Sequence, residues 1–231
     1  GFGEILLGRT TTPQARFMGR YDLNGLSESN PWKTLDVSAN GSFGGARHSN
    51  QLQYASPDIN NIQFRASYSF DETVRSQAGA KDAQLQLGIN YKKDKFNAGM
   101  VIMPSSLSGQ LDSADKKTYQ TAFSIGFMYQ SDDFKVSTLL QRDEKKSVGD
   151  SLGFGASIPL GAFEFGAQYA KIIKSENQTF KNASAFEIFS NYKISKRTSL
   201  YIIAASVNNK TKTVRKLSNK NSLSAGVIHK F

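Results

Sequence analysis

Apolar and polar residues alternate along most of this chain with a period of two. From 119 to 129 the odd positions carry Tyr, Thr, Phe, Ile, Phe and Tyr, whereas the even positions carry Gln, Ala, Ser, Gly and Met. The ranges 83–91 and 163–169 repeat this pattern. Successive side chains of a strand point to opposite faces. Each of these segments therefore predicts a strand with one bulky apolar face and one small or polar face.

The same pattern predicts about twelve strands along the whole chain. They cover residues 2–10, 49–56, 62–71, 81–92, 95–104, 118–130, 133–143, 150–160, 162–173, 183–194, 197–208 and 221–231. Windows with apolar residues at helical spacing are scarce, and no apolar run approaches the roughly 18 residues of a membrane-spanning helix. The chain is therefore predicted to be all-β.

Short and long connections alternate between these strands. The short ones are 56–61, 92–95, 130–133, 160–162 and 195–197, and the long polar ones are 71–80, 104–117, 142–149, 174–182 and 208–220. This alternation is typical of an antiparallel up-and-down barrel, in which one rim carries tight turns and the other carries loops. We interpret residues 1–231 as a single domain of this kind.

The composition of the two faces indicates which one contacts lipid and which one contacts water. Aromatic residues gather near the ends of the apolar set, at Tyr91, Phe96, Tyr119, Tyr129, Phe134, Tyr169, Tyr192, Tyr201 and Phe231. The other set consists mainly of Gly, Ser, Ala, Gln and Asn. Aromatic girdles around a wet lumen belong to barrels that face lipid. The pattern favours a transmembrane barrel, and a soluble β-barrel binding protein is the alternative from another class.

Composition and charge narrow the chemistry. The chain has 29 Lys and Arg against 19 Asp and Glu, a net charge of +10, which suggests an anionic partner. It has no Cys and 2 His, so disulfides, thiolate sites and histidine-rich metal sites are excluded, and we predict no metal and no cofactor. No nucleophile elbow or glycine-rich phosphate loop is present, so we predict that the protein is not an enzyme.

The excess of basic residues includes a run from Lys210 to Lys220 in one of the long connections. Its charges are scattered among Asn, Thr and Ser, as in a solvated loop. We therefore expect contact with lipopolysaccharide there, and no nucleic acid as a partner.

Several strings resemble one protein family. The strings are Gly1-Phe2-Gly3-Glu4-Ile5-Leu6-Leu7-Gly8-Arg9, Asn30-Pro31-Trp32, Ala46-Arg47, Gln53-Tyr54-Ala55-Ser56-Pro57, Ala66-Ser67-Tyr68, Ile194-Ser195-Lys196-Arg197-Thr198-Ser199 and Gly226-Val227-Ile228-His229-Lys230-Phe231. Together and in this order they are similar to Gram-negative trimeric porins of the β-proteobacterial or neisserial type. The resemblance implies a barrel in the outer membrane and passive diffusion of small hydrophilic solutes and ions. It also implies a homotrimer in membrane lipid, and recognition of the terminal Phe231 by the barrel assembly machinery.

Members of this family usually have sixteen strands, so the resemblance implies that the chain begins at the fifth. The number twelve is even, and closure of the first strand against the last is topologically allowed. A closed barrel of this size would be narrow, with a Cα radius of about 12 Å.

The connection from Thr10 to His48 is the longest in the chain. The resemblance implies that it folds into the lumen as a constriction loop, about residues 11–48, with acidic loop residues opposite a basic wall. Arg9 and Arg47 match wall arginines of the family, and Arg65 has the parity to join them. In the loop, the candidate residues are Arg16, Arg20, Glu28, Lys33 and Asp36.

Arg9 shares the parity of Ile5 and Leu7, so it points inward only if Gly8 permits a bulge. A basic wall opposite acidic groups creates a transverse field that sorts ions by sign. We therefore predict an anion-preferring porin, and a substrate-specific channel is the second candidate.

Overall fold

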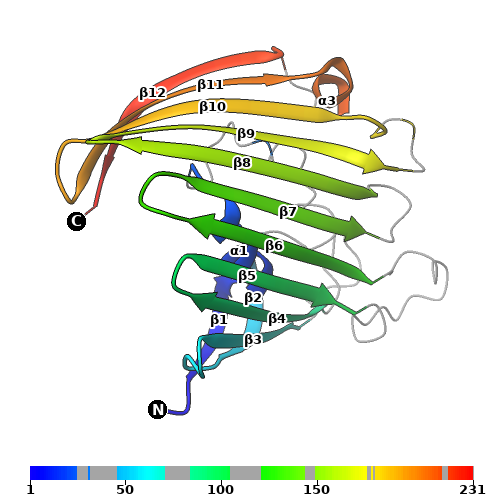
Figure 1. The fold of residues 1–231 in the computed structure, drawn as a ribbon. Helices are drawn as coiled ribbons and strands as arrows, with labels where there is room; N and C mark the ends of the chain where they lie inside the picture. The colour runs from blue at the N-terminus through cyan, green and yellow to red at the C-terminus, as the bar shows by residue number, and fades with distance from the viewer. Residues whose placement is uncertain are drawn as a thin grey trace.

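The computed structural model describes residues 1–24, 31, 46–70, 84–104, 121–143, 149–175, 178, 180–214 and 218–230. Its 12 strands form one curved sheet in which neighbours in the chain pair antiparallel (Figure 1). The strands are β1 (Glu4–Thr11), β2 (Arg47–Ala55), β3 (Ile62–Ser69), β4 (Gln84–Lys93), β5 (Phe96–Met103), β6 (Ala122–Gln130), β7 (Lys135–Asp143), β8 (Asp150–Leu160), β9 (Phe163–Lys174), β10 (Ser184–Lys193), β11 (Thr198–Val207) and β12 (Asn221–His229). The predicted all-β, up-and-down architecture is confirmed.

Tight turns gather at one rim of the sheet, on the left of Figure 1, where both chain ends also lie. The turn between β2 and β3 shows the local chemistry. Asn60 and Asn61 have φ of 53° and 70°, inside a bridge between Ile59 and Ile62. Hairpin turns with two positive φ values favour asparagine because it tolerates the left-handed region. Asp58 stabilises the turn, since its Oδ1 accepts from the Asn61 N–H at 2.8 Å.

The two edges of the sheet are β1 and β12, and no pairing joins them among the described residues. The sheet is thus open, and the closure of twelve strands that the sequence allowed is not made. A closed ring would have a radius of about 12 Å, of which inward side chains take roughly 5 Å. Helix α1 (Pro13–Met18) and the 3-10 helix η1 (Gly19–Tyr21) contact β3 to β7 on the inner face, and a ring would leave them little room.

The two faces of the sheet differ as predicted. On β4, the side chains of Leu87 and Tyr91 are 39% and 40% exposed, whereas Gln86 and Asn90 are 1% and 2% exposed. The same alternation continues around the sheet. Exposed rings on the outer face belong to Phe64, Phe96, Phe127, Phe134, Phe154, Phe163, Phe165, Tyr169, Phe186 and Tyr192. Phe and Tyr rings therefore surround the sheet, and amides and hydroxyls line its inner side.

Outer-face aromatic residues form pairs near the tight-turn rim. The ring centroids of Phe96 and Tyr129 lie 5.0 Å apart, and those of Phe163 and Tyr192 lie 4.6 Å apart. Tyr201 corrects the predicted aromatic set, because it pairs with Gly226 on the inner face and its ring lies over that glycine. Apolar residues occupy both parities of β11, so alternation there did not show which residues belong to the outer face.

The inner face carries one apolar cluster beneath α1 and η1. Phe17, Met18 and Tyr21 from these helices are at most 2% exposed, and they pack with Val101 and Leu139 of the sheet. The remaining members of the cluster are Met103, Ala122, Ala170, Ile172, Ala183 and Ala185. This burial holds the first part of the long connection against the wall, since apolar area removed from water stabilises the contact.

A second short helix, α3 (Asn209–Val214), lies beside β10 and β11 at the rim opposite the tight turns (Figure 1). Thr211 fixes it, because its buried hydroxyl donates to the Ser184 carbonyl at 2.8 Å and its N–H donates to Asn208 Oδ1 at 2.9 Å. None of the helices in the described ranges has the length and apolar character needed to cross a membrane.

Candidate functional site: an arginine cluster on the inner face

Local sequence explains why the long connection begins with a helix. Thr12 caps α1, since its Oγ1 accepts from the Ala15 N–H at 3.2 Å, and Pro13 occupies the first turn, where a missing N–H costs nothing. Gln14 then ties the helix to the wall. Its N–H donates to Gln86 Oε1 at 3.2 Å and its Nε2 donates to Ser124 Oγ at 2.9 Å.

Positions four apart share a helix face, which divides α1 and η1 into two sides. Phe17 and Tyr21 are both 0% exposed and face the sheet. Arg16 is exposed and Arg20 is half-buried. With Phe17 and Tyr21 buried, Arg16 is left in solvent and Arg20 at the edge of the apolar cluster.

Neutral groups hold the Arg20 side chain. Its Nη2 donates to Gln63 Oε1 at 3.3 Å, and its guanidinium lies 5.2 Å from the centroid of the Phe17 ring. With the Asn90 amide oxygen turned toward it, Nη1 donates to that oxygen at 3.2 Å. Burial lowers the pKa of Arg20, Tyr21 opposes this shift, and Arg16 adds to it. Arginine stays charged in proteins, so the site holds a cation among amides.

Arg65 of β3 joins this group from the wall. Its Nη1 donates to Gln53 Oε1 at 2.7 Å, and its charge interacts with those of Arg16 and Arg20 and with Glu4. We call Arg16, Arg20 and Arg65 the arginine cluster. The amide oxygens that accept from Arg20 and Arg65 are neutral, so these hydrogen bonds do not cancel the guanidinium charges.

Two predicted wall residues lie elsewhere. The register of β1 and β2 shifts between Gly8 and Thr10, where Arg9 faces two residues of β2. The extra residue is thus in β2, and Arg9 keeps the parity of exposed Ile5. It is exposed and donates to Ser49 Oγ at 3.1 Å.

Arg47 is exposed beside buried His48 at the start of β2. His48 occupies the inner parity, where its Nδ1 lies 2.9 Å from Ser69 Oγ. The structure therefore brings Arg65, Arg16 and Arg20 together and leaves Arg9 and Arg47 apart from them. Glu28, Lys33, Asp36 and Phe231 lie outside the described residues.

Two acidic groups that the sequence did not single out lie on the inner side. Glu187 of β10 is 0% exposed and Asp22 is 7% exposed. Gln168 of β9 joins them, because its Nε2 donates to Asp22 Oδ1 at 2.7 Å and to Glu187 Oε1 at 3.2 Å. Its Oε1 accepts from the Leu23 N–H at 3.1 Å, and Asn24 Nδ2 donates to Glu187 Oε1 at 3.1 Å. We call this arrangement the Gln168 latch.

Another inner-face carboxylate is paired with a lysine. Glu164 of β9 lies 2.7 Å from Lys135 Nζ and accepts from Ser157 Oγ at 3.0 Å. Glu164 and Glu187 thus lie on β9 and β10, whereas Asp22 follows Arg20 by two residues and the charge of Glu4 interacts with that of Arg65.

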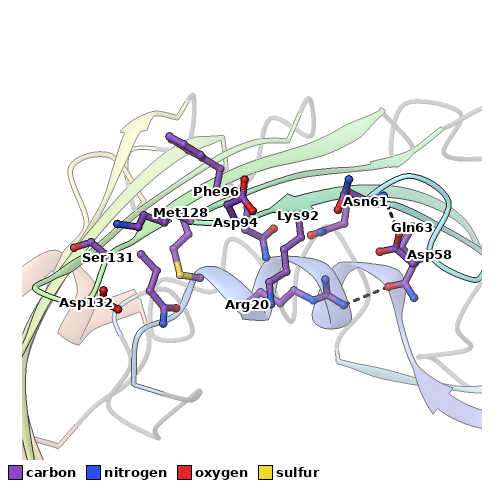
Figure 2. Close-up of a pocket in the computed structure, with 14 residues that line it drawn as sticks. Arg20, Asp58, Asn61, Gln63, Lys92, Asp94, Phe96, Met128, Ser131 and Asp132 are labelled. Atoms are coloured by element: carbon purple, nitrogen blue, oxygen red, sulfur yellow. Dashed lines mark hydrogen bonds between the residues drawn. The ribbon is translucent and has the colours of Figure 1, made fainter.

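A cavity of about 800 Å³ opens between Arg20 and the tight-turn rim, and Figure 2 shows the Arg20 side chain at it, hydrogen bonded to Gln63. Amide side chains dominate one part of its lining, and charged turn residues the other. The lining comprises Arg20, Asp58, Asn61, Gln63, Asn90, Lys92, Asp94, Lys95, Phe96, Asn97, Met128, Gln130, Ser131 and Asp132. Such a lining suits water and small polar solutes.

Comparison with known proteins identifies the family to which this chain belongs. A model of Gram-negative porins matches residues 1–212. The chain belongs to the Gram-negative porin family. It is 27% identical to outer membrane porin protein 32 of Delftia acidovorans, an alignment that covers 98% of this chain and 66% of that protein. The chain therefore spans just under two thirds of that relative's length.

Solved porin structures share the fold at lower identity. OmpF of Salmonella typhi in complex with daunomycin gives a TM-score of 0.71 at 11% identity, covering 98% of this chain and 73% of that chain. A double mutant of Rh. blastica porin gives 0.68 at 13%, with the same coverage of 98% and 73%. At these identities the likeness establishes the fold, and membership of the family places this porin in the outer membrane.

An outer-membrane position predicts that lipid contacts the outer face, and a matched pair of substitutions tests this prediction. Ile202 is 58% exposed on the outer face of β11, and Ser224 of β12 pairs with Ile203 on the inner face. We expect Ile202→Lys to cost about 2–4 kcal/mol of unfolding free energy in lipid vesicles, because lysine is poorly solvated by hydrocarbon. Ser224→Lys, at the same height, is expected to cost much less. Equal losses in denaturant titrations would contradict the assignment of faces.

Proposed function

We propose that this porin lines a water-filled channel for passive diffusion of small hydrophilic solutes and ions, with a preference for anions. The arginine cluster carries the proposal. Three guanidinium groups lie together on the inner side, and the hydrogen-bond partners described for Arg20 and Arg65 are neutral amides. A cluster of one sign in a narrow aqueous passage concentrates ions of the opposite sign.

The experiment is conductance of the refolded porin in planar bilayers with a salt gradient. We expect stepwise channel openings and a reversal potential on the anion-selective side. A reversal potential on the cation-selective side would overturn the anion preference, and the absence of openings from correctly inserted protein would overturn the channel itself.

A substrate-specific channel is the second candidate, and the cavity beside Arg20 favours it. Its amide side chains at Asn61, Gln63 and Asn97 offer donors and acceptors next to the Arg20 guanidinium, and charged turn residues of both signs complete the lining. A specific channel would show block of single-channel current by low concentrations of one carboxylate or sugar. A general channel would show no such block.

The remaining partners are part of the same proposal. The family and its relatives support transport rather than catalysis, and a homotrimer. Contact with membrane lipid and lipopolysaccharide remains a prediction. Recognition of Phe231 by the assembly machinery remains a prediction, since that residue lies outside the described ranges. Chemical cross-linking of the refolded porin in detergent tests the trimer, because a trimer gives a band at three times the mass of the chain.

A further inference from the structure

Three glycines from three neighbouring strands lie beneath the helices of the long connection. They are Gly88 of β4, Gly99 of β5 and Gly126 of β6, and Gly99 pairs directly with Gly126. All three lie on the inner face, where the parity of each strand places small or polar residues. We call them the glycine seat.

The space above the glycine seat is filled by the aromatic pair. A Cβ atom on Gly88 would lie 2.7 Å from Phe17 Cδ2, and one on Gly99 would lie 2.6 Å from Tyr21 Oη. A Cβ atom on Gly126 would overlap the Tyr21 ring. None of the three has a positive φ, so the backbone would accept another residue. Space alone requires glycine at these positions, because real Cβ atoms do not approach other heavy atoms so closely.

Polar contacts complete the seating of Tyr21. Its hydroxyl donates to Asn97 Oδ1 at 3.2 Å. Burial raises the pKa of Tyr21, against the effect of the Arg20 charge, so the hydroxyl remains a donor. The neighbouring residue, Arg20, donates to Gln63 on the wall at 3.3 Å. The depth of the Phe17 and Tyr21 rings in the wall therefore determines the position of the Arg20 guanidinium.

The segment is also fixed on both sides of the rings. Gln14 bonds to Gln86 and Ser124 before them, and Asp22 and Leu23 bond to Gln168 after them. A segment held at both ends cannot lift away freely when its middle is pushed off the wall. It bows toward the lumen instead.

We propose that the glycine seat sets the aperture of the channel and the position of its charge filter, by fixing how deeply Phe17 and Tyr21 sit in the wall. Gly88, Gly99 and Gly126 are thus positioning residues, which act through the aromatic pair on Arg16 and Arg20. The inference rests on the proposed channel function, but it concerns wall residues that touch no solute.

Single substitutions test it against a matched control. Gly126→Ala and Gly99→Ala are expected to lower single-channel conductance by about a factor of two, since pore diameter governs the flow of ions. Gly166→Ala is the control. That glycine also lies on the inner face beneath a ring, but the ring is Phe189 of the wall itself, so conductance should stay at the wild-type value. Folded Gly126→Ala porin with unchanged or increased conductance would overturn the inference.

A double substitution separates crowding from general damage. Phe17→Ala removes the ring that a side chain at Gly88 would meet. If the seat acts through that ring, Gly88→Ala changes conductance in the wild-type background and has no further effect in the Phe17→Ala background. Additive effects of the two substitutions would contradict the proposed route.

A reporter independent of conduction distinguishes failure of this inference from failure of the channel proposal. The chain has no Cys, so Met18→Cys introduces a unique thiol at a position that is 2% exposed. We expect a water-soluble maleimide to label it slowly, and several times faster after Gly126→Ala. Faster labelling of the Gly126→Ala variant in a protein that shows no conductance would support the role of the glycine seat and reject the proposed channel function. Equal labelling rates would reject the role of the glycine seat and leave the channel function untouched.

Discussion

Replacement of Arg16, Arg20 and Arg65 by glutamine is expected to remove most of the anion preference that we propose. A unit charge about 5 Å from an ion in water contributes about 0.8 kcal/mol, of opposite sign for anions and cations. Screening by 0.1 M salt reduces the difference in interaction energy between an anion and a cation to about 1 kcal/mol. Each arginine then changes the ratio of anion to cation permeability by about fivefold. The three together should lower the ratio by more than about tenfold.

The measurement is the reversal potential of single channels in a salt gradient, with Arg9→Gln as the matched control. Arg9 is an exposed arginine on the parity of Ile5, bonded to Ser49, and its removal takes away the same charge outside the cluster. We expect a shift of a few millivolts at most from Arg9→Gln. A larger shift in reversal potential from Arg9→Gln than from Arg20→Gln would mean that residues at the strand ends, and not the arginine cluster, select ions by charge.

The strands could be predicted from the sequence because each one carries its own signal. An outer face in contact with lipid must be apolar at every second residue, as at Leu87, Ile89 and Tyr91. Strand limits therefore agree with the structure to within a few residues. β11 shows the limit of the method, since Tyr201 lies in a stretch that is apolar on both parities.

The place where the long connection meets the wall could not be predicted in the same way. Phe17 lies over Gly88, which is 71 residues further along the chain, and Leu23 bonds to Gln168, which is 145 residues further. Period-two patterns report which face a residue occupies and say nothing of which distant segment covers it. Gly88 and Gln168 had the correct parity, but no signal linked them to the loop.

The wall arginines show both outcomes. Parity alone placed Arg65 on the inner face, and the structure has it beside Arg16 and Arg20. The position of Arg9 depended on which strand contained the bulge. Its extra residue lies in β2, where Asn50 has a φ of 50°, and a bulge of this kind leaves the parity of β1 unchanged. A local irregularity in the partner strand is invisible in the sequence of the strand that it affects.

The Gln168 latch provides the second large effect. Gln168→Leu keeps the approximate volume of the side chain but removes two donated hydrogen bonds to carboxylates and one accepted from the Leu23 N–H. Hydrogen bonds to charged groups contribute about 1.5–3 kcal/mol each, so losing even one of them raises the undocked population of the loop by about tenfold or more. We expect frequent brief changes of current in single channels that are steady in the wild type.

Accessibility of an introduced thiol at Asn24 measures the same release directly. Asn24→Cys should react with a water-soluble maleimide about tenfold faster in the Gln168→Leu background, since labelling follows the population of the undocked loop. Gln141→Leu is the matched control, because Gln141 is a buried glutamine of β7 whose amide nitrogen has no hydrogen-bond partner among the described residues. The same labelling rate in both leucine variants would mean that the loop is held by the glycine seat and the apolar cluster without the latch. A faster rate in Gln168→Leu alone would show that Gln168 of β9 holds the far end of the segment that carries Arg16 and Arg20.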